Sequence, residues 1–554
     1  MTYLDKYLNW KNNENLEPHL KEELLSLSQE QIKEAFYTDL AFGTGGLRGI
    51  MGVGTNRINT HVIRKATLGF ARYLIKKYNE RPLRVAISYD NRNLSYEFAL
   101  TAARVLAENN IESHVFPELR PTPLLSYAVR YLKAHGGIMI TASHNPKEYN
   151  GYKVYNETGA QLNLEESNEV INEINKIDSY FNILEKDDKN LIKMIDTSLE
   201  KSYLELVKNI HYNKTSKKAK IVYSPLHGTG GKVIVPLLKE VGYDVVPYLP
   251  QMINDPNFSA TKSSNPEDKI TYDVLIEFAK KVDAKAILVT DPDADRLGVA
   301  VLHDNDFHLI NGNQTAALEL YYLLKNTKDL DKNSFVFTTI VTSDLIKELA
   351  FSFGLKAKET LTGFKFIGEQ AASIEGKSSY FFGCEESYGS LIRDFVRDKD
   401  AVQAVFLLAE MINYLADNNK TLIDYLETIY QEFGYYYEWT NQVSLKGIEG
   451  AAKIVKIMEH YRNNPLNIDG FELLYHDDFE HSKRYYHDHF EIIDLPKSNV
   501  VKFVYNDNLW VTFRPSGTEP KIKIYFGVKS DSKDSSKALV NKINEKIIKT
   551  IDNL

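Results

Sequence analysis

The sequence predicts three α/β domains followed by a smaller α+β domain, and three observations lead to this fold class. The chain has 554 residues, more than the roughly 250 to 300 that one hydrophobic core can organise, so we expect three or four domains. Through most of the chain, short apolar or β-branched runs alternate with longer segments of helical period, as in α/β units with parallel strands. The last part instead resembles antiparallel strands joined by tight turns.

The first domain shows the α/β pattern most clearly. Residues 83–90 (LRVAISYD) predict a strand, residues 95–109 a helix, and residues 136–146 (GGIMITASHNP) a strand that ends in a polar loop. The order then recurs, with strands expected within 219–231, 284–298, 334–343 and 378–389 and helices within 233–241 and 344–354. This indicates domains of similar plan, although the segments are too dissimilar to prove duplication.

The C-terminal part differs because its apolar runs are separated by Asn/Asp and Pro/Gly turns. Residues 500–508, 509–517 and 520–530 predict antiparallel strands, and a lysine-rich amphipathic helix follows. The polar stretch 211–220 and a weaker boundary at 326–332 predict linkers. We therefore expect domains at 1–208, 209–325, 326–440 and 441–554.

Composition excludes several classes of function. Apolar residues make up 43% and charged residues 26% of the chain, as in ordinary globular proteins. The net charge of −8, with both signs interspersed, offers no basic stripe for nucleic acid. The single cysteine, Cys384, cannot form an intramolecular disulfide, and no apolar run has the length of a signal peptide or a membrane helix. We expect a cytoplasmic protein with neither nucleic acid nor membrane as partner.

The loop within 137–153 (GIMITASHNPKEYNGYK) follows a predicted strand and contains Ser143, His144 and Lys153. Such loops are where α/β domains place their site residues. A serine here can carry a phosphoryl group if His144 or Lys153 takes and returns its proton. A capped Asn-Pro turn would use the same residue types, so this motif alone leaves both interpretations open.

The segment DPDADRLG (291–298) places Asp291, Asp293 and Asp295 at alternate positions after an apolar strand. Three carboxylates this close repel one another unless a cation lies between them, and oxygen ligands favour Mg²⁺ over Zn²⁺. A calcium-binding EF-hand is excluded because Arg296 stands where that motif needs glycine and Leu302 where it needs glutamate. A solvated acidic turn is the structural alternative.

Two further loops suit a sugar phosphate. In GCEESYGSLIRDFVRDKDA (383–401), Glu385 and Ser387 match sugar hydroxyls, and Arg393, Arg397 and Lys399 match a phosphate. A charged turn entering a helix would have the same composition. In FRPSGTEPK (513–521), arginine and backbone donors of a tight turn form an anion site from Arg514, Ser516, Gly517 and Thr518, unless the loop is a plain hairpin turn.

Other tempting motifs fail. LHGTGGKV (226–233) has Leu226 and Val233 where a P-loop needs glycine and Ser/Thr. FGTGGLRG (42–49) has Arg48 at the third glycine of a dinucleotide fingerprint. The histidines of 475–490 lie among Asp, Tyr and Lys, which favours a solvated segment over a zinc site.

Taken in order, TASHNPKEYNGYK, DPDADRLG, GCEESYG and RPSGTEPK closely resemble the four active-site loops of the α-D-phosphohexomutase family. The resemblance extends from about Phe42 to about Gly527 and includes FGTGGLRGIMGVGTNRIN and SPLHGTG. It implies four domains around a central cleft, three of them similar mixed-sheet α/β domains and the last a smaller domain with an antiparallel sheet.

The resemblance also implies roles by position. Ser143 matches the phosphorylated serine, and with Asp291, Asp293 and Asp295 it matches the ligands of one Mg²⁺. The catalytic set would include His144, Lys153 and Arg48, with Arg296 near the phosphoserine. The substrate site would include Thr362, Gly363, Glu385, Ser387, Arg397, Lys399, Arg514, Ser516, Gly517 and Thr518. The spacing from GCEESYG to RDKD is slightly longer than in phosphoglucomutases, which weakens the match of Arg397 and Lys399.

The segment LTGFKFIGE (361–369) resembles glucose-type mutases, so the expected reaction interconverts glucose 1-phosphate and glucose 6-phosphate through phosphoserine and glucose 1,6-bisphosphate, which also serves as activator. The opening GTGGLRGIMGVGTNRIN also resembles a subfamily with phosphopentomutases, and phosphomannomutase is a further alternative. From other classes, an aspartyl-nucleophile phosphohydrolase and a silent sugar-phosphate sensor remain as hypotheses. We expect sugar phosphates as small-molecule partners, and a monomer or dimer.

Overall fold

The computed structural model describes residues 2–43, 45–445, 447–516 and 521–554. The chain forms two compact units. Unit 1 comprises Met1–Asn311, Phe364–Phe382 and Ser387–Thr421, and unit 2 comprises Gly312–Gly363, Gly383–Glu386 and Leu422–Leu554. The described residues contain four β-sheets, of six, five, four and seven strands. The predicted architecture of three mixed-sheet α/β domains and a C-terminal domain with an antiparallel sheet is confirmed, and the individual domain boundaries stay predictions.

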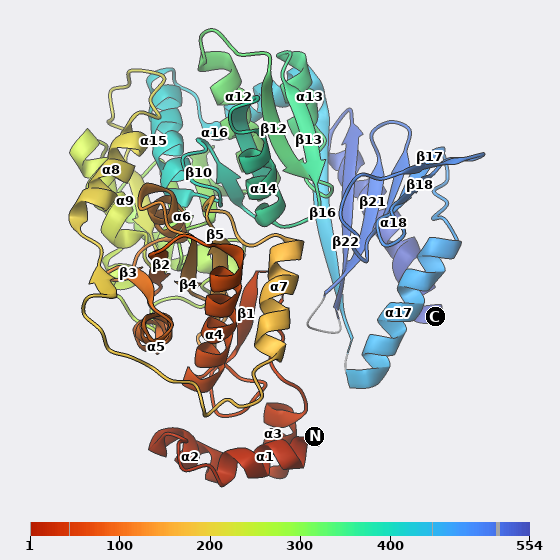
Figure 1. The fold of residues 1–554 in the computed structure, drawn as a ribbon. Coiled ribbons are helices and arrows are strands. Elements are labelled where there is room, and N and C mark those ends of the chain that lie inside the picture. The colour runs from red at the N-terminus through yellow and green to blue at the C-terminus, as the bar shows by residue number, and fades with distance from the viewer. Residues whose placement is uncertain (1, 44, 446, 517–520) are drawn as a thin grey trace. The chain divides into compact units, whose positions relative to one another are not determined.

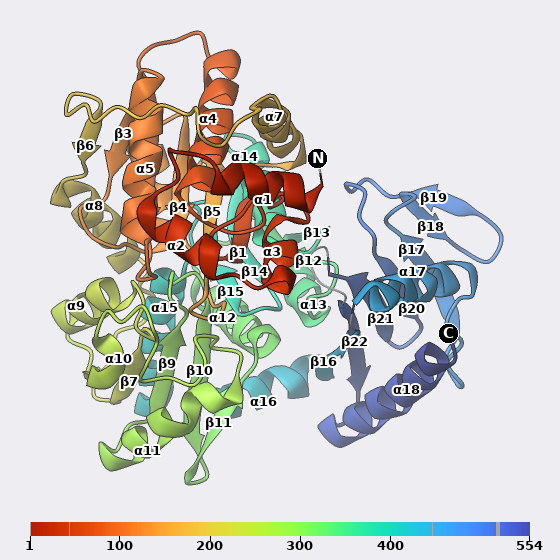
Figure 2. The ribbon, with the colours of Figure 1, turned by 90° about the horizontal axis from the view of Figure 1, so that it is seen from below.

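Unit 1 begins with three short helices (Figure 2). Their apolar side chains form a small hydrophobic core together with Val53 and Phe181. Trp10 and Phe36 lie edge to face at its centre. Capping boxes at Thr2 and Ser28 begin two of the helices, because each side chain accepts from a backbone N–H of the first turn. The helices are α1 (Tyr3–Lys11), α2 (Pro18–Ser26) and α3 (Gln29–Phe36).

The first sheet has strand order β1-β5-β4-β2-β3-β6. Strands β3, β2 and β4 are parallel, whereas β5 runs antiparallel to β4 and to β1, so the sheet is mixed. Helices α4 and α5 contribute Phe70 and Phe98 to its core, and Figure 1 shows α4 beside α7. The strands are β1 (Gly46–Ile50), β2 (Leu83–Tyr89), β3 (Ile111–Val115), β4 (Gly136–Ile140), β5 (Tyr149–Asn156) and β6 (Ile192–Met194). The helices are α4 (Thr60–Lys77), α5 (Ser95–Glu108), α6 (Thr122–Tyr131), α7 (Leu164–Asn175) and α8 (Thr197–Lys208).

The second sheet has order β11-β10-β9-β7-β8, with β8, β7 and β9 parallel and β10 and β11 antiparallel. Every residue of the apolar strand β9 is buried, as expected for a strand with both faces covered. The strands are β7 (Ile221–Ser224), β8 (Val245–Pro247), β9 (Ala286–Thr290), β10 (Leu297–His303) and β11 (Asp306–Ile310). The helices are α9 (Gly231–Val241), α10 (Leu249–Met252), η1 (Lys269–Tyr272) and α11 (Asp273–Lys281).

The third domain is divided between the units. Unit 1 contains α14 (Phe364–Ile374), β15 (Gly389–Leu391) and the buried helix α15 (Ala401–Asp417), and β14 (Ser379–Glu385) begins in unit 1 and ends in unit 2. Unit 2 contains the parallel pair β12 (Ser334–Thr339) and β13 (Lys356–Thr360), with α12 (Gly312–Asn326), α13 (Leu345–Ser352) and α16 (Leu422–Phe433). The strands and helices predicted in this region are therefore present.

The C-terminal sheet of unit 2 is antiparallel throughout, in the order β16-β22-β21-β20-β17-β18-β19. Helices α17 and α18 pack on it through Ile457, Tyr461 and Ile547, and the predicted lysine-rich helix is α18. The elements are β16 (Tyr435–Ser444), α17 (Gly447–Asn463), β17 (Leu473–Asp478), β18 (Lys483–Tyr485), β19 (Phe490–Ile492), β20 (Val501–Tyr505), β21 (Trp510–Pro515), β22 (Lys521–Ser530) and α18 (Lys533–Asn553). Within the described residues, no helix combines the length and apolar character that a membrane span requires.

Candidate active site

Ser143 lies three residues beyond the end of β4 in an unusual backbone conformation. Its φ of 51° is in the left-handed region, which costs roughly 1 kcal/mol or more for a residue with a Cβ. The backbone N–H of Ser143 donates to Thr141 Oγ1 at 2.8 Å, which fixes this turn. The hydroxyl donates to Asp291 Oδ2 at 2.7 Å, and His144 Nδ1 lies 3.3 Å from it. Two loops 148 residues apart in sequence therefore meet at the serine oxygen.

The three aspartates follow β9 and are buried, with ligand oxygens that all lie within 4.8 Å of one another. Asp291 Oδ1 accepts from the backbone N–H groups of Asp295 and Arg296, at 3.1 and 3.0 Å. Asp293 Oδ2 accepts from Thr122 Oγ1 and Lys153 Nζ, both at 2.8 Å. Asp291 is thus held through both of its oxygens, since Oδ2 accepts from Ser143, whereas Asp293 is held through Oδ2.

The remaining oxygens fit a cation. Asp293 Oδ1 and Asp295 Oδ1 are buried and have no hydrogen-bond partner among the described residues. Burial and the charges of Asp293 and Asp295 raise the pKa of Asp291 well above its usual range, because three buried carboxylates cannot all be charged without compensation. Carboxylate oxygens whose negative charge is not fully neutralised by neighbouring groups are suited to bind a hard divalent metal ion.

Basic side chains surround this cluster. Lys153 Nζ lies 3.4 Å from Asp295 Oδ2, and Lys399 Nζ lies 3.2 Å from the same oxygen. Burial lowers the pKa of Lys153, but Asp293 and Asp295 outweigh it, so the pKa is raised and the amine is protonated. Arg296 Nε lies 3.9 Å from Asp295 Oδ1, and its Nη1 donates to Glu267 at 2.7 Å.

Arg48 and His144 complete the surroundings of the serine. Arg48, on β1, donates from Nη1 to Asn145 Oδ1 at 2.9 Å. Burial, together with the charges of Arg296 and Arg48, lowers the pKa of His144 well below its usual value, so its ring is neutral near pH 7. Positive charge thus gathers where a phosphoryl group on Ser143 would lie.

The other predicted substrate residues of unit 1 lie near α14 and α15. The guanidinium of Arg397 is buried and held by the carboxylates of Glu375, at 3.0 Å, and Asp394, at 3.2 Å. Lys399 also pairs with Asp398 at 3.2 Å, and Ser387 is half-buried. In this structure Arg397 is engaged by protein carboxylates, and its predicted role in phosphate binding stays a prediction.

The predicted substrate residues of unit 2 are described within that unit. Glu385 is buried at the end of β14, and the hydroxyl of Thr362 is buried without a hydrogen-bond partner among the described residues. Gly363 has φ of 117°, a conformation that side chains rarely adopt. Arg514, on β21, donates from Nη1 to Tyr525 at 3.4 Å, and Ser516 donates its backbone N–H to Lys521 O at 2.8 Å. The predicted residues Gly517 and Thr518 lie outside the described residues.

Sequence reasoning missed the side chains that hold the two loops in place. Thr122, at the start of α6, contacts Asp293 with both its hydroxyl and its backbone N–H. Asp90 and Arg92 follow β2, the parallel neighbour of β4, and lie beneath the Ser143 loop. Their position after a strand was the available signal, because carboxyl ends of neighbouring parallel strands meet at one sheet edge.

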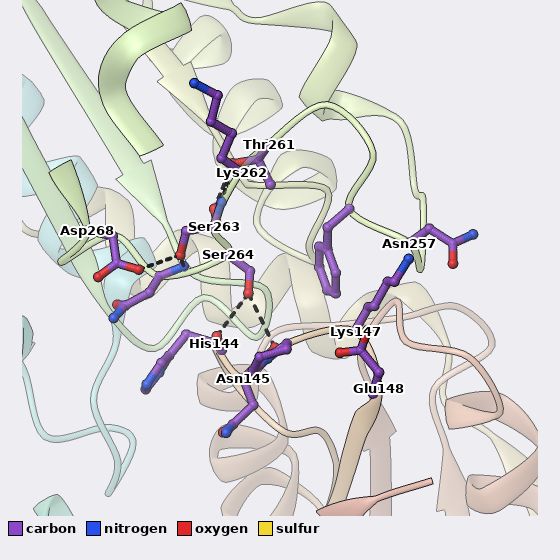
Figure 3. A pocket seen from close by; sticks show the side chains of 13 residues that line it. His144, Asn145, Lys147, Glu148, Asn257, Thr261, Lys262, Ser263, Ser264 and Asp268 are labelled. Atoms are coloured by element: carbon purple, nitrogen blue, oxygen red, sulfur yellow. Dashed lines mark hydrogen bonds between the residues drawn. The ribbon is translucent and has the colours of Figure 1, made fainter. Parts of the chain in front are cut away.

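A cavity of about 410 Å³ opens beside the Ser143 loop (Figure 3). It lies between residues 144–148 and the loop 257–268 of the second domain. Ser264 spans the two segments, donating to His144 O at 2.9 Å and to Asn145 O at 3.3 Å, as the dashed lines of Figure 3 show. The second domain therefore contacts the serine loop directly.

Comparison with known proteins gives matches over nearly the whole chain. Residues 39–181, 201–304 and 311–433 match the alpha/beta/alpha domains I, II and III of phosphoglucomutase/phosphomannomutase, and residues 468–545 match its C-terminal domain. A phosphoglucomutase of Staphylococcus epidermidis is 38% identical over 529 residues, covering 94% of this chain and 96% of the relative. A phosphoglucomutase of Staphylococcus aureus is 39% identical over 540 residues, covering 96% of each.

Solved structures agree on the fold. The open form of parafusin, a phosphoprotein from Paramecium, superposes with a TM-score of 0.68 at 21% identity, covering 93% of this chain and 95% of that one. A phosphoglucomutase/phosphomannomutase family protein of Burkholderia thailandensis gives 0.68 at 18% identity, covering 92% and 97%. With four matching domains in the expected order and relatives above a third identical over almost full length, the chain belongs to the α-D-phosphohexomutase family, that of phosphoglucomutase and phosphomannomutase.

Proposed function

We propose that the chain is a phosphoglucomutase that interconverts glucose 1-phosphate and glucose 6-phosphate, with Ser143 as the phosphoryl carrier. The observation that carries the proposal is the 2.7 Å hydrogen bond between the Ser143 hydroxyl and Asp291. It joins the candidate carrier to the candidate metal ligands, beside the largely buried side chains of Lys153 and Lys399. A serine in an ordinary surface turn would not be expected to lie beside three buried carboxylates.

Asp291, Asp293 and Asp295, with an oxygen on Ser143, would hold one Mg²⁺ ion. This assignment is supported by Asp293 Oδ1 and Asp295 Oδ1, which have no hydrogen-bond partner in the described part of the chain. When bound, Mg²⁺ would neutralise charge on the phosphoryl oxygens. Glucose 1,6-bisphosphate would serve as activator by phosphorylating Ser143.

The residues around Ser143 then have distinct tasks. A sugar hydroxyl oxygen bonds to phosphorus as the bond from phosphorus to the serine oxygen breaks, and the sugar proton moves to a nearby base. His144 Nδ1 is within reach of the serine oxygen and suits the transfer of that proton. Lys153 and Arg48 stabilise charge on the equatorial phosphoryl oxygens, which is greatest in the transition state.

The bisphosphate must then turn over so that its second phosphate faces Ser143. We assign the distal phosphate to Arg514, Ser516, Gly517 and Thr518, the sugar hydroxyls to Glu385 and Ser387, and supporting contacts to Thr362, Gly363, Arg397 and Lys399. Two phosphate sites of similar chemistry make the exchange feasible without release of the intermediate. Exclusion of water during this exchange protects the phosphoserine from hydrolysis.

Glucose is the preferred sugar because the curated relatives are named phosphoglucomutases and align over 94% or more of this chain. Ribose 1-phosphate and mannose 1-phosphate are the alternatives within the family. A phosphohydrolase is disfavoured, because the four domain matches are to phosphoglucomutase/phosphomannomutase and the curated relatives are named phosphoglucomutases. We further propose a cytoplasmic monomer or dimer.

The test is a coupled assay of glucose 6-phosphate formation from glucose 1-phosphate, with Mg²⁺ and a trace of glucose 1,6-bisphosphate. Ribose 1-phosphate and mannose 1-phosphate are assayed in parallel by product analysis, and released phosphate is measured in each. The highest kcat/KM with glucose 1-phosphate is expected. A preference for another sugar would reassign the substrate, and phosphate release without isomerisation would refute the mutase.

A further inference from the structure

Arg92 lies buried beneath the Ser143 loop, where its guanidinium donates to backbone oxygens of that loop and pairs with the carboxylate of Asp90. We propose that Arg92 is a positioning residue that holds Ser143 in the geometry needed for phosphoryl transfer. Its Nη2 donates to Ser143 O and to Asn145 O, both at 2.6 Å. Its Nη1 donates to Pro146 O at 2.8 Å and to Tyr149 O at 3.0 Å. One side chain thus binds four carbonyls between the end of β4 and the start of β5.

Only arginine can make this set of contacts. The four terminal N–H groups of a guanidinium lie in one plane and point in fixed, diverging directions, and each here reaches a different carbonyl. A lysine ammonium has three donors on one nitrogen and cannot span the same loop. The function of Arg92 therefore depends on the shape of its side chain as well as on its charge.

Asp90 couples the arginine to the serine backbone. Asp90 Oδ2 lies 3.2 Å from Arg92 Nε and accepts from Thr141 Oγ1 at 2.7 Å. Thr141 Oγ1 in turn accepts the backbone N–H of Ser143 at 2.8 Å. Both the N–H and the C=O of Ser143 are thus held by one buried network, which explains how a left-handed serine persists at this position.

The second domain closes the network from the other side. The ring of Phe258 lies 5.2 Å from the guanidinium of Arg92, and a planar cation suits such a contact. Ser264 donates to the carbonyls of His144 and Asn145 beside the cavity of Figure 3. The Ser143 loop is therefore held by Arg92 on one side and by Ser264 of the second domain on the other.

The proposal rests on the proposed function, in which Ser143 exchanges the phosphoryl group. Because the hydrogen bonds of Arg92 go to carbonyls of the Ser143 loop, its loss should slow phosphoryl transfer without weakening substrate binding. A displacement of about 1 Å at a reacting atom typically costs on the order of 100-fold in rate. We expect Arg92→Lys to lower kcat by roughly 30- to 100-fold while KM for glucose 1-phosphate stays within about twofold.

The experiment compares wild type, Arg92→Lys, Ser264→Ala and the control Arg57→Lys. Arg57 also donates to backbone carbonyls of the first domain, those of Glu34 and Asn56, but lies away from the Ser143 loop. For each protein, kcat, KM and the rate of Ser143 phosphorylation by glucose 1,6-bisphosphate are measured, and amide hydrogen exchange is followed by mass spectrometry. Circular dichroism checks that each variant is folded at the assay temperature.

We expect exchange in residues 141–149 to rise at least about tenfold in Arg92→Lys, with the remaining peptides of the first domain and all peptides of Arg57→Lys unchanged. Ser264→Ala should show the same pattern with a smaller loss of kcat, about 3- to 10-fold. If Arg92→Lys fails to fold, Ser264→Ala decides the proposal. Unchanged exchange in residues 141–149, or a loosened loop with wild-type kcat, would overturn it. Wild type without mutase turnover would instead refute the proposed function, and the exchange result would still decide whether Arg92 holds the loop.

Discussion

Thr122 joins the first domain to the loop 291–295 of the second domain through a single side-chain hydrogen bond to Asp293. A substitution that removes only this hydroxyl therefore tests one interaction. The hydroxyl donates to Asp293 Oδ2 at 2.8 Å, and the side chain is fully buried. Thr122 and Lys153 both donate to Oδ2 of Asp293, whereas Oδ1 of Asp293 has no hydrogen-bond partner among the described residues. In Thr122→Val the shape is preserved and this single donor is lost.

A hydrogen bond to a charged group contributes roughly 1.5 to 3 kcal/mol. If about 2 kcal/mol of this is lost from the orientation of Asp293, Mg²⁺ affinity should fall about 30-fold, within the range of about 10- to 100-fold seen for groups that orient metal ligands. Isothermal titration of the metal-free protein with Mg²⁺ measures this without any substrate. The matched control is Thr122→Ser, which keeps the hydroxyl and should bind Mg²⁺ within about threefold of wild type.

Two results would refute the reasoning. Wild-type Mg²⁺ affinity in Thr122→Val would mean that the hydroxyl does not orient Asp293. Equal weakening in Thr122→Val and Thr122→Ser would mean that packing, not the hydrogen bond, decides the affinity. Chemical denaturation in EDTA provides a second readout, since the valine variant also leaves Asp293 short of a donor and should be less stable than the serine variant.

Three further outcomes are expected. Ser143→Ala should reduce mutase turnover by at least roughly a thousandfold while the protein still binds Mg²⁺, and substantial turnover would exclude Ser143 as carrier. Gly228→Ala should displace the loop 291–295 and lower kcat, because an added Cβ would lie 2.3 Å from Pro292 Cα. A wild-type kcat would show that the loop accommodates the added methyl group. Burial raises the pKa of Glu17, but His61 outweighs it and the pKa is lowered to about 2. Because Glu17 is partly exposed to solvent, the resulting stabilisation is about 1 to 2 kcal/mol; it is present above the unfolded value of about 4.5 and is lost as pH falls towards 2. Glu17→Gln should therefore accelerate hydrogen exchange in α2 roughly 10-fold at pH 7 and hardly at all near pH 2, and equal effects at both pH values would contradict this assignment.

The sequence already located most of the residues that meet at the serine. Ser143, Asp291, Asp293 and Asp295 were recognisable because polar residues that end buried apolar strands gather at one edge of an α/β sheet. The antiparallel C-terminal sheet was also predictable, since its turn residues separate short alternating strands. These features depend on local pattern, which a sequence displays directly.

The tertiary structure alone decided which partners complete the site. Three contacts join segments of the chain that no sequence periodicity links. Ser143 donates to Asp291, Thr122 donates to Asp293, and Arg92 donates to four carbonyls around Ser143. Local sequence fixes where a strand ends and which side chains follow it. Long-range packing fixes which of those side chains face one another. It therefore decides which carboxylate oxygens are available to a cation, and it holds Ser143 in its strained backbone conformation.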